Sequence, residues 1–309
     1  VYATLPIQPG DTVTRQSVVQ SVQALFATGN YEDVQLGRDG DDLVVMVSER
    51  PSIARIELSG NKSIEEDALR KGLTEAGLAE GEVFQRSTLE AISGELERQY
   101  VAQGRYGADI STEVTPLPRN RVALKIDIYE GKSARINDIN IVGNTVFDDD
   151  ELLKVFNLRP SHFWSFIKGD DKYSRERLAG DLEQLRSYYL DRGYINFSIE
   201  STQVAVTPDR EKVALTINVN EGEQYTVNSI KLAGDLVVDE EQLRSLVVLD
   251  KGQVFSQQQV TYTSDLIKRR LGNEGYTFAE VRGIDQATND DDNTVDVVFY
   301  VEPGRKVYV

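Results

Sequence analysis

The sequence offers few residues that could carry catalytic chemistry. It contains one histidine, His162, and no cysteine, which excludes disulfides, thiolate metal sites and cysteine nucleophiles. A Ser-His-Asp triad would have to be built around His162, and a metal site would have at most one imidazole ligand. No phosphate-binding G-x-x-x-x-G-K-[ST] loop and no G-x-G-x-x-G fingerprint is present. We therefore expect a protein that is not an enzyme and that has no cofactor or metal site.

Adjacent carboxylates are the other groups that could do chemistry, and they occur in runs at residues 65–67, 148–151 and 239–241. Such a run can bind a cation, or it can lie at the start of a helix, where the positive end of the helix dipole favours negative charge. No loop pattern typical of an oxygen-ligand site surrounds the runs. Nothing marks a pocket that would separate the pKa values of a catalytic pair. We interpret the runs as the first turns of short helices.

The surroundings of His162 are aromatic, because Phe163, Trp164 and Phe166 follow it closely. Exposed aromatic residues favour protein interfaces, so this loop could be a partner-binding patch. Local packing of a long loop between two helices accounts for the same residues equally well. Both interpretations stay open at the level of the sequence.

Composition and charge narrow the class of protein. With 40% hydrophobic and 28% charged residues, the chain has enough apolar material for packed cores. The formal net charge of -17 repels phosphate groups and argues against binding to nucleic acid or anionic membranes. No segment approaches the roughly 18 consecutive apolar residues of a membrane-spanning helix, and the first residues do not resemble a signal peptide. As it stands, the chain is expected to be soluble.

An internal repeat with a spacing of about 80 to 90 residues positions these groups. Alternating strands end in glycine at Gly60, Gly143 and Gly234. Helical stretches are followed by glycine and then a tyrosine within two residues, and these glycines are Gly29, Gly104, Gly193 and Gly275. A period-2 strand closes each copy and ends in an acidic residue, namely Glu49, Glu130, Glu221 and Glu302. Three independent landmarks therefore indicate four copies of one unit.

Each of the three complete copies has the element order βααββ. A strand is followed by a short helix, a longer helix capped at Ser87, Ser174 or Ser256, and a hairpin with turn residues. We predict an α+β fold, a tandem array of four modules, each a three-stranded mixed sheet with two helices on one face. The predicted modules are 1–50, which lacks its first strand, 51–132, 133–222 and 223–305, with 306–309 the start of a fifth.

This element order, the Gly-Asn pairs at Gly60 and Gly143, and the glycine–tyrosine pattern after the second helix resemble the polypeptide-transport-associated (POTRA) domain family. The resemblance covers essentially the whole chain. It implies a five-module arm at the periplasmic face of the bacterial outer membrane, attached to a C-terminal membrane barrel that this chain does not contain. The implied partners are unfolded outer-membrane β-barrel proteins and accessory lipoproteins of the assembly complex, without nucleic acid.

The second strand of each module should lie at a sheet edge, because the third strand pairs with both neighbours. Unpaired N–H and C=O groups at an edge can accept a foreign strand, a mode called β-augmentation that reads backbone before side chains. The candidate edges are residues 33–36, 108–114, 195–206 and 278–284. The predicted partner-binding residues on them are Ile110, Val114, Gln203, Val204, Ala205, Val206, Phe278 and Val281.

For the third module, the resemblance implies that Gln203 to Val206 form the docking site of a lipoprotein with a propeller fold. The alternative is that most edges bind nothing and that charges such as Asp109, Glu113 and Glu200 prevent pairing.

Two classes of function remain. The first is a binding arm that receives nascent barrel proteins, with linkers at 130–133 and 221–224 that let the modules swivel. The second is a pure scaffold that contacts only folded partners, as expected of a cell-division protein or of a two-partner secretion or translocation-assembly transporter. The number of modules favours the first class, because a division protein resembles one copy and secretion transporters resemble two.

Overall fold

The computed structural model describes residues 1–162, 165, 169–289 and 292–307. The chain divides into two compact units, Val1–Ser133 and Ala134–Val309. The described part of the first unit holds a two-stranded and a three-stranded sheet, and that of the second holds two three-stranded sheets. Helices accompany each sheet in the predicted order. The predicted fold class, a tandem array of α+β modules, is confirmed.

The first module is a helix packed on a hairpin. Thr14 caps the helix, since its side chain accepts a hydrogen bond from the Ser17 N–H while the Ser17 side chain accepts one from the Thr14 N–H. Leu25, Tyr31 and Val34 form its buried core. The elements are α1 (Arg15–Ala27), β1 (Tyr31–Asp39) and β2 (Asp42–Glu49).

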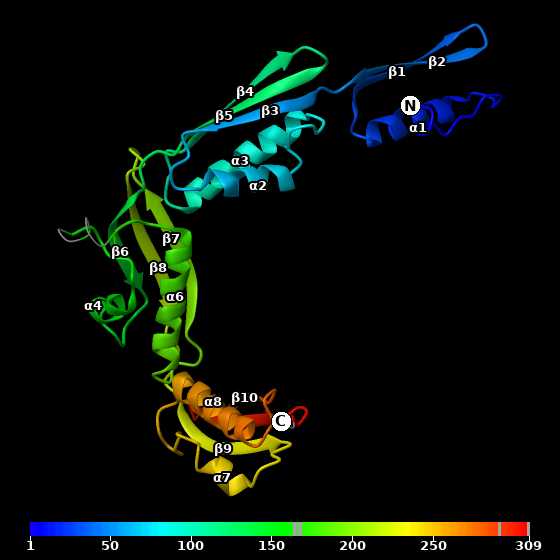
Figure 1. Ribbon diagram of the computed structural model, residues 1–309. Coiled ribbons are helices and arrows are strands. Elements are labelled where there is room, and N and C mark those ends of the chain that lie inside the picture. Colours follow the sequence, from blue (N-terminus) through cyan, green and yellow to red (C-terminus); the bar gives the residue numbers. More distant parts are fainter. Residues whose placement is uncertain (163–164, 166–168, 290–291, 308–309) are drawn as a thin grey trace. The chain divides into compact units, whose positions relative to one another are not determined.

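The second module shows the complete unit, with α2 and α3 lying on the same face of the sheet (Figure 1). The strand order is β3-β5-β4, with β5 parallel to β3 and antiparallel to β4. Alternate residues of β5 from Val122 to Ile128 point into the core, where they meet Leu69, Leu73 and Leu89 of the helices. The elements are β3 (Ser52–Ser59), α2 (Glu66–Glu75), α3 (Arg86–Ala102), β4 (Asp109–Leu117) and β5 (Arg121–Tyr129).

The third and fourth modules repeat this topology, with strand orders β6-β8-β7 and β10-β11-β9. The third consists of β6 (Arg135–Val142), α4 (Asp149–Leu152), the 3-10 helix η1 (Leu153–Val155), α6 (Arg175–Leu190), β7 (Ser198–Val206) and β8 (Lys212–Asn220). The fourth consists of β9 (Thr226–Gly234), α7 (Glu240–Arg244), α8 (Gln257–Asn273), β10 (Glu280–Asn289) and β11 (Thr294–Glu302).

Helix starts follow the sequence signals with one exception. The side chains of Ser174 and Ser256 cap α6 and α8 as predicted. The predicted cap at Ser87 is wrong, because α3 begins at Arg86 after Gln85, which makes no side-chain cap. The backbone just before this helix is held against the first strand, since the Phe84 N–H donates to Pro51 O at 2.8 Å. That contact, which is remote in sequence, fixes where the helix can begin.

The acidic runs lie in the first turns of α2, α4 and α7, which confirms the helix-start interpretation. Within the described residues, no group of three or more His, Cys, Asp or Glu side chains is placed to hold a metal ion. None of the described helices combines the length and the apolar composition needed to cross a bilayer.

Candidate functional site: the free sheet edges

The second strand of each complete module lies at a sheet edge, as predicted. β4, β7 and β10 each pair with one strand, which is the central strand β5, β8 or β11. The central strand is the last in sequence and inserts between the first two, so the second strand has a partner on one side only. One row of its backbone N–H and C=O groups therefore faces outward.

The opposite edge of each sheet is partly covered by the chain itself. The Ile53 N–H donates to Glu82 O, and the Phe84 N–H donates to Pro51 O, both at 2.8 Å. The segment before the long helix thus pairs with the first residues of β3. The same bridge recurs between Arg135 and Lys172 and between Thr226 and Val254. A foreign strand would therefore meet a more open edge on the second strand than on the first.

The direction of the backbone groups on β7 follows from its pairing. The Thr207 N–H donates to Lys212 O at 3.0 Å, so Thr207 faces β8. Antiparallel pairs alternate between hydrogen-bonded and non-bonded positions. The N–H groups of Thr202, Val204 and Val206 therefore point away from β8. Among the described residues, no backbone group outside β8 bonds to this strand.

Two of the three β7 residues whose N–H groups point outward, Val204 and Val206, are apolar. Val204 and Val206 pair with Leu215 and Val213, which are buried, so these valines stand on the helix-covered face; Val206 is still 37% exposed. Gln203 and Ala205 stand on the open face and are exposed. The only charge on the strand, Glu200, lies at a register shift between Ile199 and Ser201. The run from Ser201 to Val206 is therefore uncharged and regularly paired.

β4 is a less open edge than β7. Ile110 and Val114 pack partly against the core of the second module. Pro116 pairs with Val122 and has no N–H to donate, so it lies at an outward position and removes one donor from the edge. Asp109 and Glu113 place charge on the open face of the same strand.

β10 differs from the prediction at its start. Phe278 was expected on the edge strand, but β10 begins at Glu280 and Phe278 lies in the preceding turn, 73% exposed. Val281 lies on the strand and packs partly against the core. Asp285 pairs with Val297 and places a carboxylate at a core-side position of this edge. Two positions further back, Gly283 leaves room for helix α8, because a Cβ there would lie 2.3 Å from Val260 Cγ1.

The sequence pattern marks Glu130 and Glu221 as the ends of strands, but it does not indicate that their carboxylates are buried. Glu221 is 6% exposed and accepts hydrogen bonds from the Thr145 N–H at 2.8 Å, the Thr145 hydroxyl at 2.6 Å and the Tyr189 hydroxyl at 2.9 Å. Glu130 does the same in the second module, accepting from the N–H groups of Lys62 and Ser63 at 2.6 and 2.7 Å. Each carboxylate fixes the loop after the first strand to the last strand.

These contacts set the pKa values of the groups involved. Burial by itself would raise the pKa of Glu221, but the hydrogen bonds from Thr145, Tyr189 and the Val146 N–H outweigh it and hold that pKa below its usual value. The pKa of Glu130 is lowered in the same way by Ser63 and Lys62. Burial, with the charge of Glu130, raises the pKa of Tyr100 to about 12. Burial and the hydrogen bond to Glu221 raise the pKa of Tyr189 as well. Both carboxylates are therefore charged, and the phenols of Tyr100 and Tyr189 are neutral, near neutral pH.

The fourth module lacks this arrangement. Gly60, Gly143 and Gly234 contact the carbonyl oxygens of Ile128, Val219 and Val301, which fixes the true register of the repeat. Two residues beyond these carbonyls lie Glu130, Glu221 and Pro303. Glu302 is therefore not the equivalent of the other two glutamates, as the sequence landmark assumed, and it forms an exposed ion pair with Arg282.

The expected swivel linkers also begin with tethered residues. Glu130 and Glu221 are buried, so the first residue of each segment, 130–133 and 221–224, is held in place. Between the third and fourth modules, the Tyr225 N–H donates to Gly193 O at 2.8 Å and the Gln224 side chain donates to Arg192 O at 2.9 Å. This junction is bonded directly.

His162, around which a Ser-His-Asp triad would have to be built, lies near one serine and one aspartate. Ser165 Oγ lies 2.5 Å from His162 Nδ1, and His162 Nε2 lies 3.9 Å from Asp170 Oδ2. Ser165 is only 1% exposed, so its hydroxyl is closed to a substrate. Its Oγ also accepts from the His162 N–H, which is a local turn contact. The aromatic residues Phe163, Trp164 and Phe166 lie outside the described residues.

Comparison with known proteins gives one family and several relatives. Residues 51–131, 134–222 and 225–304 match the family described as "POTRA: Surface antigen variable number repeat". The chain is 32% identical over 310 residues to outer membrane protein assembly factor BamA of Neisseria meningitidis serogroup B, covering 100% of this chain and 39% of that protein. It is 27% identical over 305 residues to BamA of Buchnera aphidicola, covering 99% and 49%.

The chain therefore spans less than half the length of these two relatives. Among solved structures, the crystal structure of Haemophilus influenzae BamA POTRA3-5 is similar with a TM-score of 0.47 and 22% sequence identity, covering 82% of this chain and 96% of that one.

Proposed function

Because the chain belongs to the POTRA family, we propose that it is the periplasmic arm of an outer-membrane protein assembly factor and binds unfolded β-barrel proteins along the free edge of β7. In this proposal the arm also holds accessory lipoproteins and continues into a membrane barrel at the periplasmic face of the outer membrane. The proposal is supported by similarity along the whole chain to two proteins named as assembly factors.

Strand addition suits a factor with many different substrates. Backbone hydrogen bonds supply most of the affinity, and they are the same for any extended segment. Side chains contribute only at alternate positions. An unfolded barrel protein consists largely of segments destined to become strands, so it presents many stretches that an exposed edge can pair with.

The observation that carries the proposal is the uncharged, unpaired edge of β7. Thr202, Val204 and Val206 direct their N–H groups outward from a run without charge or proline. The equivalent edges carry obstacles to pairing, Pro116 on β4 and Asp285 on β10. Among the three complete modules, the third therefore offers the most favourable edge.

The test is a titration of the isotope-labelled chain with a synthetic peptide that has the alternating apolar and polar residues of a transmembrane strand. We expect amide shifts at Thr202, Val204 and Val206. Val204→Pro removes one outward N–H without breaking the bonds between β7 and β8, and should weaken binding about tenfold. Val204→Ala keeps the N–H and should change affinity by less than about twofold.

A matched control exists on β4. Val114 shares the outward parity of Pro116, so Val114→Pro removes the same kind of donor from a different edge. The Val114→Pro variant should bind the peptide with the wild-type affinity. Equal affinities for Val204→Pro and Val204→Ala would contradict strand addition at β7. Shifts confined to helix amides would instead favour the scaffold function, in which the arm contacts only folded partners.

A further inference from the structure

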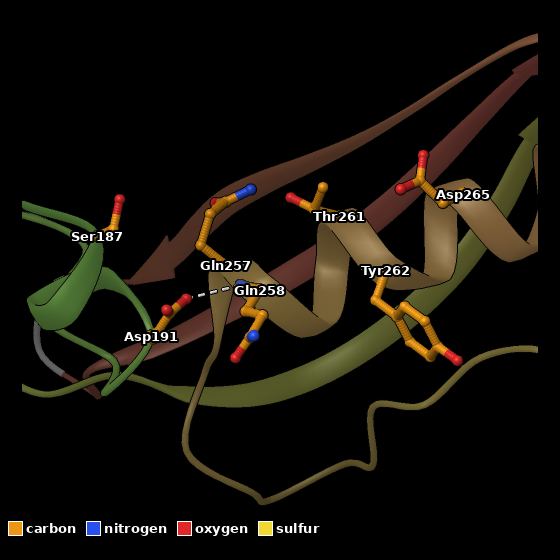
Figure 2. Close-up of a pocket in the computed structure, with 7 residues that line it drawn as sticks. All are labelled: Ser187, Asp191, Gln257, Gln258, Thr261, Tyr262 and Asp265. Atoms are coloured by element: carbon orange, nitrogen blue, oxygen red, sulfur yellow. Dashed lines mark hydrogen bonds between the residues drawn. The ribbon is translucent and has the colours of Figure 1, made fainter. Parts of the chain in front are cut away.

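A hollow lies where the third module meets the fourth. It has a volume of about 380 Å³ and is formed by the end of α6 and the first turns of α8. Figure 2 shows Ser187 and Asp191 on the α6 side, with Gln258, Tyr262 and Asp265 along α8. Both helices belong to the same compact unit.

A second hollow of about 390 Å³ continues the first along α6. The two share Ser187 and Asp191, and the second adds Glu183 and Tyr188. Glu183, Ser187 and Asp191 are four positions apart along α6 and its end, so they lie on one face, which is separate from the buried face that carries Leu185 and Tyr189. Together the hollows form one trough, which we call the α6–α8 trough.

The trough is built on a junction that hydrogen bonds hold in place. Asp191 Oδ1 accepts from the Gln258 N–H at 2.7 Å, so the residue that follows α6 caps the first turn of α8 in the next module. Gly193 makes the close approach possible, because a Cβ there would lie 2.8 Å from Tyr225 O. The walls on the two sides of the trough are therefore fixed relative to each other without a partner.

The charge in the trough is negative and incompletely balanced. Glu183, Asp191 and Asp265 are its carboxylates, and no ion pair found among the described residues includes Glu183 or Asp265. Its guanidinium, on Arg192, is already engaged, since it donates to Tyr188 O at 3.0 Å and lies 3.4 Å from the centre of the Tyr188 ring.

We propose that the α6–α8 trough docks a helical segment of a partner protein that carries arginine or lysine residues at successive turns of one face. One cation would meet Asp265, and another would meet Glu183 on the far side of Asp191. The ring of Tyr262, which is 52% exposed, points to the other side of α8 from Asp265 (Figure 2) and offers a separate contact. Carboxylates attract the cation, and a tyrosine face adds cation–π attraction and apolar contact. A partner bound here touches the third and fourth modules at once.

The test uses a defined probe, a helical peptide of several turns with an arginine at each turn of one face, and a counterpart with glutamate at the same positions. Only the arginine peptide should bind, with amide shifts at Ser187, Gln258 and Asp265 and an affinity that falls as salt is raised. The double variant Glu183→Gln with Asp265→Asn should weaken binding at least about fivefold.

A matched variant removes equal charge from the same two modules outside the trough. Glu176→Gln with Asp250→Asn changes two exposed carboxylates and should leave affinity within about twofold of wild type. Equal losses in the two double variants would overturn the proposal, because binding would then follow net charge alone. Binding of the glutamate peptide, or shifts confined to β7, would overturn it as well.

Discussion

Glu221 shows how one residue links distant parts of a module. It lies just beyond the last strand, and it bonds to Thr145, 76 positions earlier, in the loop after the first strand. The Glu221 carboxylate also accepts a hydrogen bond from the hydroxyl of Tyr189 at the end of α6. A buried carboxylate is costly unless it is fully hydrogen-bonded, and here its bonds join a strand, a loop and a helix. In the fourth module, Leu271 and Pro303 stand where the second and third modules carry the tyrosine and the glutamate.

Replacing Glu221 by glutamine should therefore destabilise the third module by about 2 kcal/mol near neutral pH, since charged hydrogen bonds become neutral ones. The folded-state pKa of Glu221 is lowered, so its stabilising contribution is complete above the unfolded value of about 4.3 and is lost as pH falls through the folded value. The difference between variant and wild type should shrink in acid. Hydrogen exchange of the β8 amides, at neutral and at acidic pH, measures this difference in stability.

The control for this variant is Glu223→Gln, two residues further on, where the carboxylate is exposed. It should leave protection of the β8 amides unchanged at both pH values. An equal loss of protection in the two variants would show that the buried contacts of Glu221 are not the cause.

At the level of elements, the turn that ends the first strand is the most constrained feature of the repeat. Gly143 has a φ of 97°, and a Cβ there would lie 2.2 Å from Val219 O. The glycine is therefore required twice, by the backbone conformation and by the close approach of β8. A Cβ added at Gly60 or Gly234 would lie 2.0 or 2.3 Å from the corresponding carbonyl oxygen in the second or fourth module.

Gly143→Ala should cost at least about 2 kcal/mol of the unfolding free energy of the third module. A glycine in the same module provides the comparison: Gly180 lies within α6 with open space around its Cβ position. Gly180→Ala should stabilise the module by about 0.5–1 kcal/mol, because alanine is the better helix former. Chemical denaturation followed by circular dichroism measures both changes, and shifts of the same sign would contradict the account.

At the level of the whole molecule, the chain consists of two units with separate cores. The core of the second module lies within Val1–Ser133, and that of the fourth lies within Ala134–Val309. Each sheet is completed by strands from a short stretch of sequence. Folding of one unit should therefore require no contact with the other.

Residues 1–133 and 134–309, produced as separate chains, should each give the amide spectrum that they show within the whole protein. A division after residue 208 should behave differently, because it separates β7 from β8, the strand that pairs with both β6 and β7. Neither fragment could then complete the third sheet, and the signals of that module should collapse. Loss of structure in both cases would show that the two units depend on each other.

Much of this architecture could be predicted from local patterns. The glycines after the first strands and long helices, the acidic runs before the short helices and the alternation of the last strands repeat along the chain, and each reflects backbone geometry or helix electrostatics. The edge position of the second strand follows from the element order together with the expectation that the third strand pairs with both of the others. The error at Ser87 arose because a long-range backbone contact, not a local cap, sets the start of α3.

By itself, then, the sequence determined the repeat, the fold class and the edges of the sheets, because these depend on residue types at fixed short spacings. Tertiary structure alone decided which N–H groups of β7 point outward, that Glu221 is a buried acceptor while Glu302 is not, and that α6 and α8 meet in an acidic trough. Those properties depend on strand register and on contacts between residues far apart in the chain. A shift of one residue, invisible in a local pattern, reverses the face on which a strand residue lies.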